Sequence, residues 1–129
     1  MTVNKIEILQ KYTQAWNEHD IDTIMAMTAN ECAFYTIAGP EVYGTEHKGR
    51  DKVRAAFEAA WTNFPDAAWV DGEFYDLGGN KAMTTSTFKG TDLNGDRHEA
   101  QMVDLFVFDG DKIATKNAFR KNRPAIKGE

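Results

Sequence analysis

Three glycine-containing dipeptides divide the second half of the chain at regular intervals and constrain its fold more than any other feature. They are Gly78-Gly79, Asn94-Gly95 and Asp109-Gly110, and each suits the positive backbone φ angles of a tight hairpin turn. The segments between them are rich in β-branched and aromatic residues. The pattern therefore predicts four antiparallel strands, at 67–77, 81–90, 97–108 and 112–120.

The first half of the chain has helical periodicity instead. Apolar residues recur at three- and four-residue spacing in the first helix, at Ile8, Leu9, Tyr12, Ala15 and Trp16. Asp20 or Asp22 can cap a short second helix, and a first strand is expected at 32–37, followed by a long polar loop. A third helix should begin near Arg50 and stop at Pro65.

These elements predict one α+β domain over residues 1–129. Its three helices, placed towards the N-terminus, should pack on one face of a curved, mostly antiparallel sheet and close a cone-shaped pocket, as in a cystatin-like α+β barrel. Fifteen basic and twenty acidic residues give a net charge of -5 without a basic cluster, which argues against nucleic acid as a partner.

The apolar segments of the chain are too short for membrane insertion. The amino terminus lacks the features of a signal peptide, and no apolar run is long enough to cross a bilayer, so we expect a cytoplasmic protein with no membrane partner. Cys32 is the single cysteine and is interpreted as a core residue. Metal-ligand spacings, phosphate-binding loops and dinucleotide motifs are missing from the sequence, so no metal and no cofactor are expected.

A carboxylic acid, Asp104, lies in the most apolar stretch of the chain, QMVDLFVF. Strand alternation places it on one face with His98, Ala100, Met102, Phe106 and Phe108. An unpaired charge in such surroundings is costly, so the acid must be paired, hydrogen-bonded or neutral through a raised pKa. Asp104 is therefore the leading candidate for a functional residue.

The sequence resembles the nuclear-transport-factor-2-like superfamily, especially its SnoaL-like polyketide cyclase and ketosteroid isomerase branches. The pieces that carry the resemblance are YTQAWNEHDIDTIMAMTANECAFY, GRDKVRAAFEAAWTNFPD and VDLFVFDGDKI. The resemblance covers nearly the whole chain and rests on the order and spacing of these pieces. Fold alone does not settle function, because the superfamily contains both enzymes and noncatalytic binding domains.

The resemblance implies roles for two residues. Tyr12 matches the helix-one tyrosine of the isomerase branch, and Asp104 matches its protonated oxyanion-hole acid. The general base of that branch corresponds to Thr36, which cannot take the proton, so ordinary ketosteroid isomerase activity is disfavoured. In the cyclase branch an acid on the penultimate strand serves in an aldol ring closure, a role open to Asp104.

Lys116 receives two conflicting interpretations. The resemblance directs Lys116 into the cavity, where an ion pair would hold Asp104 ionised and remove its proton-donor role. Apolar alternation instead places its neighbours Thr115 and Asn117 inside and leaves Lys116 exposed. We expect exposure, and Lys116 is retained among the candidate pocket residues for the orientation that the resemblance implies.

Other side chains are candidates for the pocket lining. His98 is a candidate acid or base at the cavity mouth, although a position just after a hairpin turn favours exposure. Bulky or polar residues from the remaining elements complete the expected set, which comprises Trp16, Tyr35, Thr36, Phe57, Trp61, Met102 and Phe106.

The residues and the resemblance together predict a small cofactor-independent enzyme. Asp104 would be its acid or base, Tyr12 its hydrogen-bond donor, and an apolar carbonyl compound of polyketide-like or steroid-like type its substrate. The alternative is a noncatalytic module of the same fold that binds a small ligand or forms dimers. The resemblance further implies a homodimer paired through the outer face of the sheet.

Overall fold

A computed structural model describes residues 3–127 as one six-stranded sheet with three helices. The elements in chain order are α1 (Lys5–Asn17), α2 (Ile21–Ala26), β1 (Thr28–Tyr35), β2 (Glu46–Lys48), α3 (Arg50–Asn63), β3 (Ala68–Asp76), β4 (Lys81–Thr91), β5 (Arg97–Asp109) and β6 (Lys112–Arg120). The strands lie side by side in the order β2-β1-β6-β5-β4-β3. All neighbouring pairs are antiparallel except β1 and β6, which are parallel.

The predicted meander is confirmed as β3 to β6, with every boundary within one residue of its expected position. The glycines of its turns have positive φ angles, for example 86° at Gly78 and 54° at Gly79, as tight hairpins between twisted strands require. The long antiparallel pairing of β4 with β5 runs without a break from Lys81 opposite Val107 to Thr91 opposite Arg97. This regular pair is the centre of the sheet.

The predicted order of two helices, a first strand and a third helix from Arg50 is found, so the three helices do not all precede the sheet in the chain. The expected barrel was wrong. The sheet is open, since β2 and β3 are its unpaired edges. β1 begins at Thr28, earlier than expected, and the three polar residues of β2 are too few to show a strand pattern.

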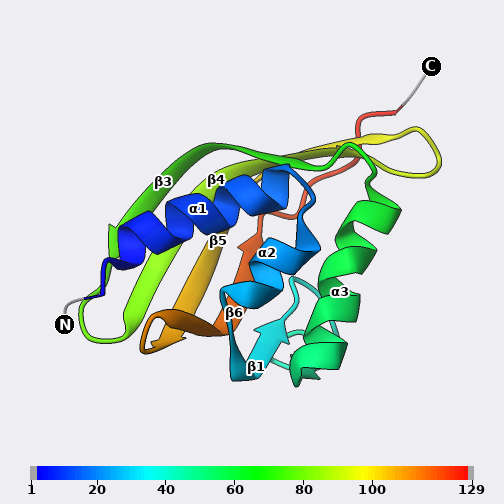
Figure 1. Cartoon of the computed structure of the whole chain (residues 1–129). Coiled ribbons are helices and arrows are strands. Elements are labelled where there is room, and N and C mark those ends of the chain that lie inside the picture. The colour runs from blue at the N-terminus through cyan, green and yellow to red at the C-terminus, as the bar shows by residue number, and fades with distance from the viewer. Residues whose placement is uncertain (1–2, 128–129) are drawn as a thin grey trace.

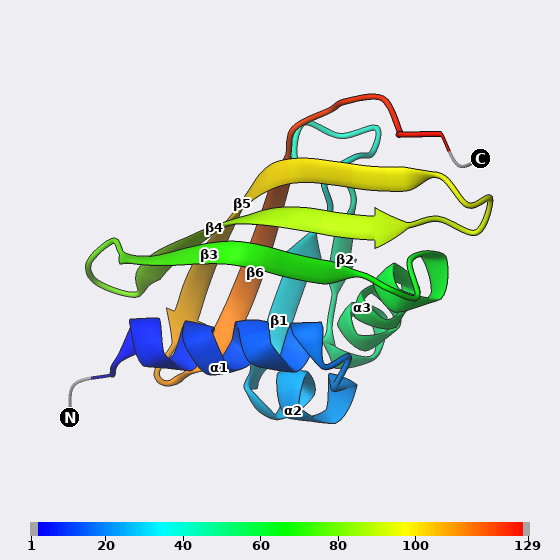
Figure 2. The same ribbon diagram turned by 90° about the horizontal axis from the view of Figure 1, so that it is seen from above.

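The helices cover one face of the curved sheet (Figures 1 and 2). α1 crosses β3 and β4, and α3 packs beside β1 and β2. Local contacts fix each helix in place: Asp20 caps α2 through the Thr23 amide, and the Arg50 guanidinium at the start of α3 donates to the carbonyls of Met25 and Thr28. These contacts fix the distance between the helices and the sheet. The side chains that enter this space then determine how much of it is filled.

The core fills most of that space. Its most deeply buried large side chains come from all three helices, at Leu9, Tyr12, Ile24, Val53 and Phe57. Cys32 is buried in the same cluster, as expected for a core residue. No helix within residues 3–127 combines the length and apolarity needed to cross a membrane.

Candidate functional site

A narrow hollow, here called the polar hollow, lies between α1 and the inner face of the sheet. Its volume is about 20 Å³, which is close to the space needed for one water molecule. It is lined by Tyr12, Thr13, Trp16, Trp69, Gly72, Phe74, Thr84, Thr85, Ser86, Asp104, Phe106 and Lys116. Both residues that the resemblance marks as catalytic, Tyr12 and Asp104, therefore line the same hollow.

Asp104 occupies the middle of β5, opposite Thr84 of β4 and Ala118 of β6. Only 6% of its surface is exposed, and its Oδ1 atom has no hydrogen-bond partner within residues 3–127. Burial raises the pKa of the Asp104 carboxyl, and the positive charge of nearby Lys116 opposes that rise. The raised pKa makes the Asp104 carboxylate a stronger base than an exposed aspartate.

Tyr12 is placed by the apolar stripe of α1, which directs its side chain into the core. Its ring meets Phe106 edge-on, with 5.7 Å between centroids. Burial raises the pKa of the Tyr12 phenol, which keeps the hydroxyl protonated at neutral pH. The Trp16 indole opposes this rise, yet neither Tyr12 Oη nor Trp16 Nε1 has a hydrogen-bond partner of normal geometry among the described residues.

Lys116 points inward, so the expectation that it is exposed was wrong. β6 carries one extra residue, Ala114, where the pairing shifts from Phe108 opposite Ile113 to Val107 opposite Thr115. This bulge reverses the alternation along the rest of the strand and turns Lys116 towards the helices. Only 7% of Lys116 is exposed.

The Lys116 ammonium lies among aromatic rings. Nζ is 4.0 Å from the centroid of the Trp16 ring and 5.4–5.7 Å from those of Phe57, Phe34 and Tyr12. Within residues 3–127 it makes no hydrogen bond, and no ion pair within 4.0 Å joins it to Asp104. Burial lowers the pKa of Lys116, while the charge of Asp104 opposes this change.

A second inner hollow, here called the apolar hollow, has a volume of about 280 Å³. It is lined by Trp16, Phe34, Thr36, Ile37, Ala56, Ala59, Ala60, Asn63, Phe64, Trp69, Phe88, Met102, Lys116, Ala118 and Arg120. Three small residues on one side of α3, Ala56, Ala59 and Ala60, leave this space unfilled. Trp16, Trp69 and Lys116 line both hollows and form the partition between them.

Most of the expected pocket residues lie at these hollows. Thr36 and Met102 line the apolar hollow, Phe106 lines the polar one, and Trp16 lines both. Phe57 and Trp61 pack against Trp16 from behind, with ring centroids 4.8 and 5.0 Å away, and line neither hollow. These two residues are core supports of the site rather than part of its wall.

Tyr35 and His98 lie outside both hollows, which corrects their assignment to the pocket. The Tyr35 hydroxyl donates to Glu46 at 2.8 Å on the opposite face of β1. His98 bonds to Asp92 at 2.8 Å beside the β4–β5 turn, and its ring meets Phe64 edge-on. The Asp92–His98 contact lowers the pKa of the Asp92 carboxyl.

Thr36 is held by local hydrogen bonds. Its hydroxyl donates to the Ala38 carbonyl at 2.6 Å and accepts from the Thr45 amide at 3.1 Å. Gly44, with a φ angle of 85°, passes so close that a β-carbon there would lie 2.2 Å from the Thr36 carbonyl oxygen. Thr36 is therefore a wall residue whose polar group is already occupied.

Sequence reasoning missed several lining residues. Arg120 enters the apolar hollow because it lies four residues after Lys116, beyond the bulge that alternation did not anticipate. Thr84 faces Asp104 directly across the β4–β5 pair, and the hairpin turn between these strands would have given this register. Phe34 follows from strand alternation with Thr36, since residues two apart in extended backbone share a face.

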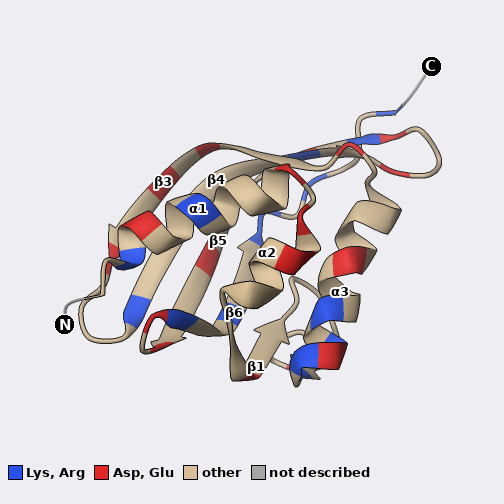
Figure 3. Ribbon diagram, in the orientation of Figure 1, with Lys and Arg blue, Asp and Glu red and all other residues tan. Residues whose placement is uncertain are grey.

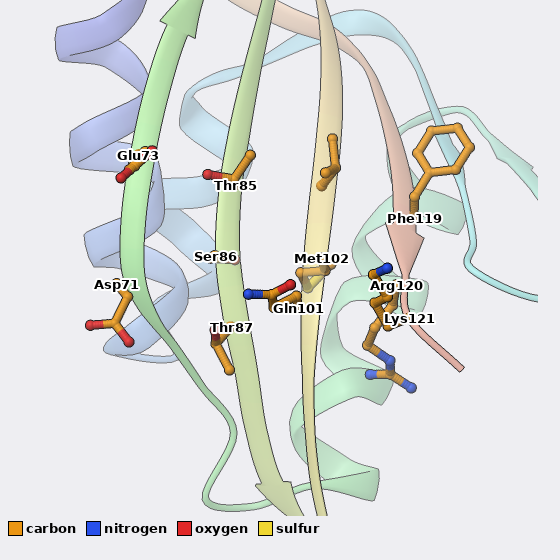
Figure 4. Close-up of a pocket in the computed structure, with 11 residues that line it drawn as sticks. Asp71, Glu73, Thr85, Ser86, Thr87, Gln101, Met102, Phe119, Arg120 and Lys121 are labelled. Atoms are coloured by element: carbon orange, nitrogen blue, oxygen red, sulfur yellow. The ribbon is translucent and has the colours of Figure 1, made fainter. Parts of the chain in front are cut away.

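A larger depression, of about 590 Å³, lies on the face of the sheet turned away from the helices (Figure 4). Its lining includes Glu73, Thr85, Gln101 and Phe119 from four different strands. None of the buried unpartnered polar atoms found in the described residues belongs to this outer depression. The inner hollows are therefore the better candidate site despite their smaller size.

Charged residues of both signs are interspersed along the helices and the outer strands (Figure 3). No group of three or more His, Cys, Asp or Glu residues in the described part of the chain is arranged to hold a metal ion.

Comparisons with known proteins agree with this architecture. The family model described as a SnoaL-like domain matches residues 9–116. A presumed polyketide cyclase from Pseudomonas putida KT2440 superposes with a TM-score of 0.80 at 16% identity, over 92% of each chain. No curated protein matches the sequence.

Two further solved structures have similar folds. A protein of unknown function with a cystatin-like fold from Xanthomonas campestris has a TM-score of 0.80 at 21% identity, over 93% of this chain and 92% of the other. A phenazine biosynthesis-related protein, PhzB2, from Pseudomonas aeruginosa has a TM-score of 0.79 at 16% identity, over 91% and 75%. At these identities the structures establish the fold alone.

Proposed function

Because the chain belongs to the SnoaL-like domain family, we propose that it is a small cofactor-independent enzyme that performs acid–base chemistry on an apolar carbonyl compound. One observation carries the proposal: Asp104 and Lys116 are both buried and line the polar hollow, and within residues 3–127 Asp104 Oδ1 has no hydrogen-bond partner and no close ion pair joins the two groups. Buried ionisable groups without such partners are costly to keep and are concentrated at functional sites.

The directions of the two pKa changes suit proton transfer. A carboxylate with a raised pKa is a stronger base, and an ammonium with a lowered pKa is a stronger acid, so both move towards neutral pH. A carbonyl ligand in the apolar hollow would meet Lys116 at the partition. Lys116 would then donate to the carbonyl oxygen as negative charge develops there.

Asp104 would act from behind the partition. The polar hollow has room for about one water, which can carry a proton between the ligand's α-carbon and the Asp104 carboxylate. The Tyr12 hydroxyl, kept protonated by burial, is a second neutral donor in the same space. An enolate formed in this way could be reprotonated at another carbon or attack a second carbonyl, which are the isomerase and cyclase outcomes.

Exchange of α-hydrogens for deuterium tests this proposal without knowledge of the natural substrate. 2-Tetralone, a compact apolar ketone with acidic α-hydrogens, is incubated with the protein in D₂O and followed by NMR. The wild-type protein should accelerate exchange, and Asp104→Asn and Lys116→Met should each lower the rate by at least about 100-fold. Lys121→Met removes the same charge from an exposed position and should leave the rate unchanged.

Ketone binding is measured in parallel by quenching of tryptophan fluorescence. Variants that bind 2-tetralone normally yet fail to exchange it would support catalytic roles for Asp104 and Lys116. Unchanged exchange in Asp104→Asn would overturn the role given to this acid.

The second candidate is a noncatalytic ligand-binding module of the same fold. The small size of the polar hollow favours it, since a ligand in the apolar hollow cannot touch Asp104 directly while the Trp16 partition is in place. Binding of 2-tetralone by the wild-type protein without any exchange above the background rate would select this alternative.

The homodimer implied by the resemblance remains a prediction. Apolar side chains on the outer face support it: Phe119 is 50% exposed at the outer depression (Figure 4), and Leu105, on the same face of β5 as Gln101, is 37% exposed. Sedimentation equilibrium should give twice the chain mass, and Phe119→Glu should shift the protein to monomers. A wild-type protein that sediments as a monomer would contradict the prediction.

A further inference from the structure

The apolar hollow has an unusual charge composition. Among its lining residues the only charged side chains are Lys116 and Arg120, and both are positive. The protein as a whole has a net charge of -5, so this positive interior does not follow from its overall composition. A site with two cations and an apolar wall suits a ligand that is apolar along its length and negative at one end.

Arg120 lies four residues after Lys116 on β6, and both side chains face the helices beyond the Ala114 bulge. Four residues of extended strand separate their α-carbons by about 13 Å, and the two charged groups lie against different rings, Trp16 for Lys116 and Phe88 for Arg120. Arg120 is half-buried and also borders the outer depression and the groove beside His98, which places it at the mouth.

The Arg120 guanidinium is free to bind a ligand. Its central carbon lies 4.7 Å from the centroid of the Phe88 ring, which orients the group without using its N–H donors. Within residues 3–127 it makes no hydrogen bond and no ion pair. The neighbouring acid Glu99 is paired with Arg97 instead, at 2.8 Å.

We propose that the natural ligand is a compact aromatic or alicyclic keto acid whose carboxylate binds Arg120 and whose carbonyl group points towards Lys116. The carbonyl end of this assignment rests on the proposed function, whereas the carboxylate end rests on Arg120 alone. A planar carboxylate matches the fork of guanidinium donors. The ring system would pack against Phe34, Trp69 and Phe88 in between.

The size and surroundings of the hollow narrow the ligand further. Its volume of about 280 Å³ is at the lower limit for small-molecule sites, which favours one or two rings over a four-ring steroid. The second half of α3 lines the hollow from Ala56 to Asn63, and the C-terminal end of a helix carries partial negative charge. A single carboxylate is therefore favoured over a doubly charged phosphate.

A matched pair of probes tests the carboxylate end without any reaction. 2-Naphthoate and 2-acetonaphthone share one ring system and differ in whether the substituent is a carboxylate or a neutral methyl ketone. We expect 2-naphthoate to bind at least tenfold more tightly at constant ionic strength, measured by tryptophan quenching and calorimetry. Arg120→Gln should remove most of this preference and leave 2-acetonaphthone binding unchanged.

Two matched controls locate the effect. Lys121→Gln removes a positive charge from the next residue, which is exposed at the end of β6, and should preserve the preference for 2-naphthoate. Ala60→Leu fills the apolar hollow and should weaken both probes at least tenfold. Ala55→Leu makes the same change on the exposed side of α3 and should weaken neither.

The possible failures are distinguishable. Equal binding of the two probes, or a preference that survives in Arg120→Gln, would overturn the keto-acid assignment and leave the 2-tetralone exchange result standing. Failure of both probes to bind, or binding that is insensitive to Ala60→Leu, would overturn the apolar hollow as the ligand site and the proposed function with it.

Discussion

The polar and apolar hollows share three lining residues, Trp16, Trp69 and Lys116, yet they differ in almost every other respect. The polar hollow holds Asp104 and the Tyr12 hydroxyl but has room for about one water. The apolar hollow is more than tenfold larger but has no acid in its wall. Reactive groups and ligand space are therefore separated by one layer of side chains.

This separation gives Asp104 and Lys116 different relations to a ligand in the apolar hollow. Asp104 lies on the far side of the partition from the apolar hollow, where burial raises the pKa of its carboxyl. Lys116 is the only ionisable residue that lines both spaces. It is the group through which a change at the ligand can affect Asp104.

Removing the partition should have the largest effect. Trp16 is 4% exposed and packs against Tyr12, Phe57 and Trp61, so Trp16→Ala should lower the free energy of unfolding by about 3–5 kcal/mol. Urea unfolding measures this loss, and Trp16→Phe, which retains a ring, should lose much less. A loss below about 1 kcal/mol in Trp16→Ala would mean that the two hollows are not separated by a packed side chain.

The buried acid should give a smaller effect with a defined dependence on pH. Burial raises the pKa of Asp104 in the folded protein above its unfolded value of about 3.9. Between these two values the folded state holds a proton that the unfolded state has released, so stability falls as pH rises. A tenfold difference in proton affinity between the folded and unfolded states corresponds to about 1.4 kcal/mol of stability.

Asp104→Asn should therefore gain stability relative to wild type as pH rises from about 4 towards neutral. Urea unfolding at a series of pH values measures the difference between the two proteins. The double variant Asp104→Asn, Lys116→Met removes both titrating groups and should show the flattest profile of the three. A wild-type profile parallel to that of Asp104→Asn would show that the folded protein leaves this carboxyl with its ordinary pKa.

The smallest expected effect lies outside both hollows. Tyr35 bonds to Glu46 on the far face of β1, so Tyr35→Phe should change stability by no more than about 0.5 kcal/mol and leave probe binding unchanged. A clear loss of 2-naphthoate binding in Tyr35→Phe would mean that the apolar hollow extends across the strand.

The regular parts of the molecule could be predicted from sequence. The turn dipeptides and the alternation in β5 gave the meander, and they placed Asp104, Met102 and Phe106 on the buried face. Alternation succeeds there because β4 and β5 pair without a bulge. The order of the elements likewise predicted helices on one face of the sheet.

The irregular parts could not be predicted in this way. The bulge at Ala114 leaves no mark in the alternation of β6, so Lys116 was expected outside and Arg120 was not considered. Tyr35 was assigned to the pocket although its neighbour Thr36 lines it, since adjacent residues in extended backbone point to opposite faces. The width of each hollow depends on how closely α1 and α3 pack on the sheet. The hydrophobic pattern within a single helix or strand does not specify that distance.

The extra residue in β6 has a consequence for how this cavity can diversify. Because the bulge accommodates Ala114 as an extra residue, Lys116, Ala118 and Arg120 lie opposite the inward residues Phe106, Asp104 and Met102. Loss of Ala114 would make the pairing regular and leave these three side chains on the inner face. A strand that kept Ala114 without the bulge would instead turn Thr115, Asn117 and Phe119 inward, and the interior would lose both cations. Related chains with the same scaffold could therefore differ in ligand charge through the presence or absence of this bulge.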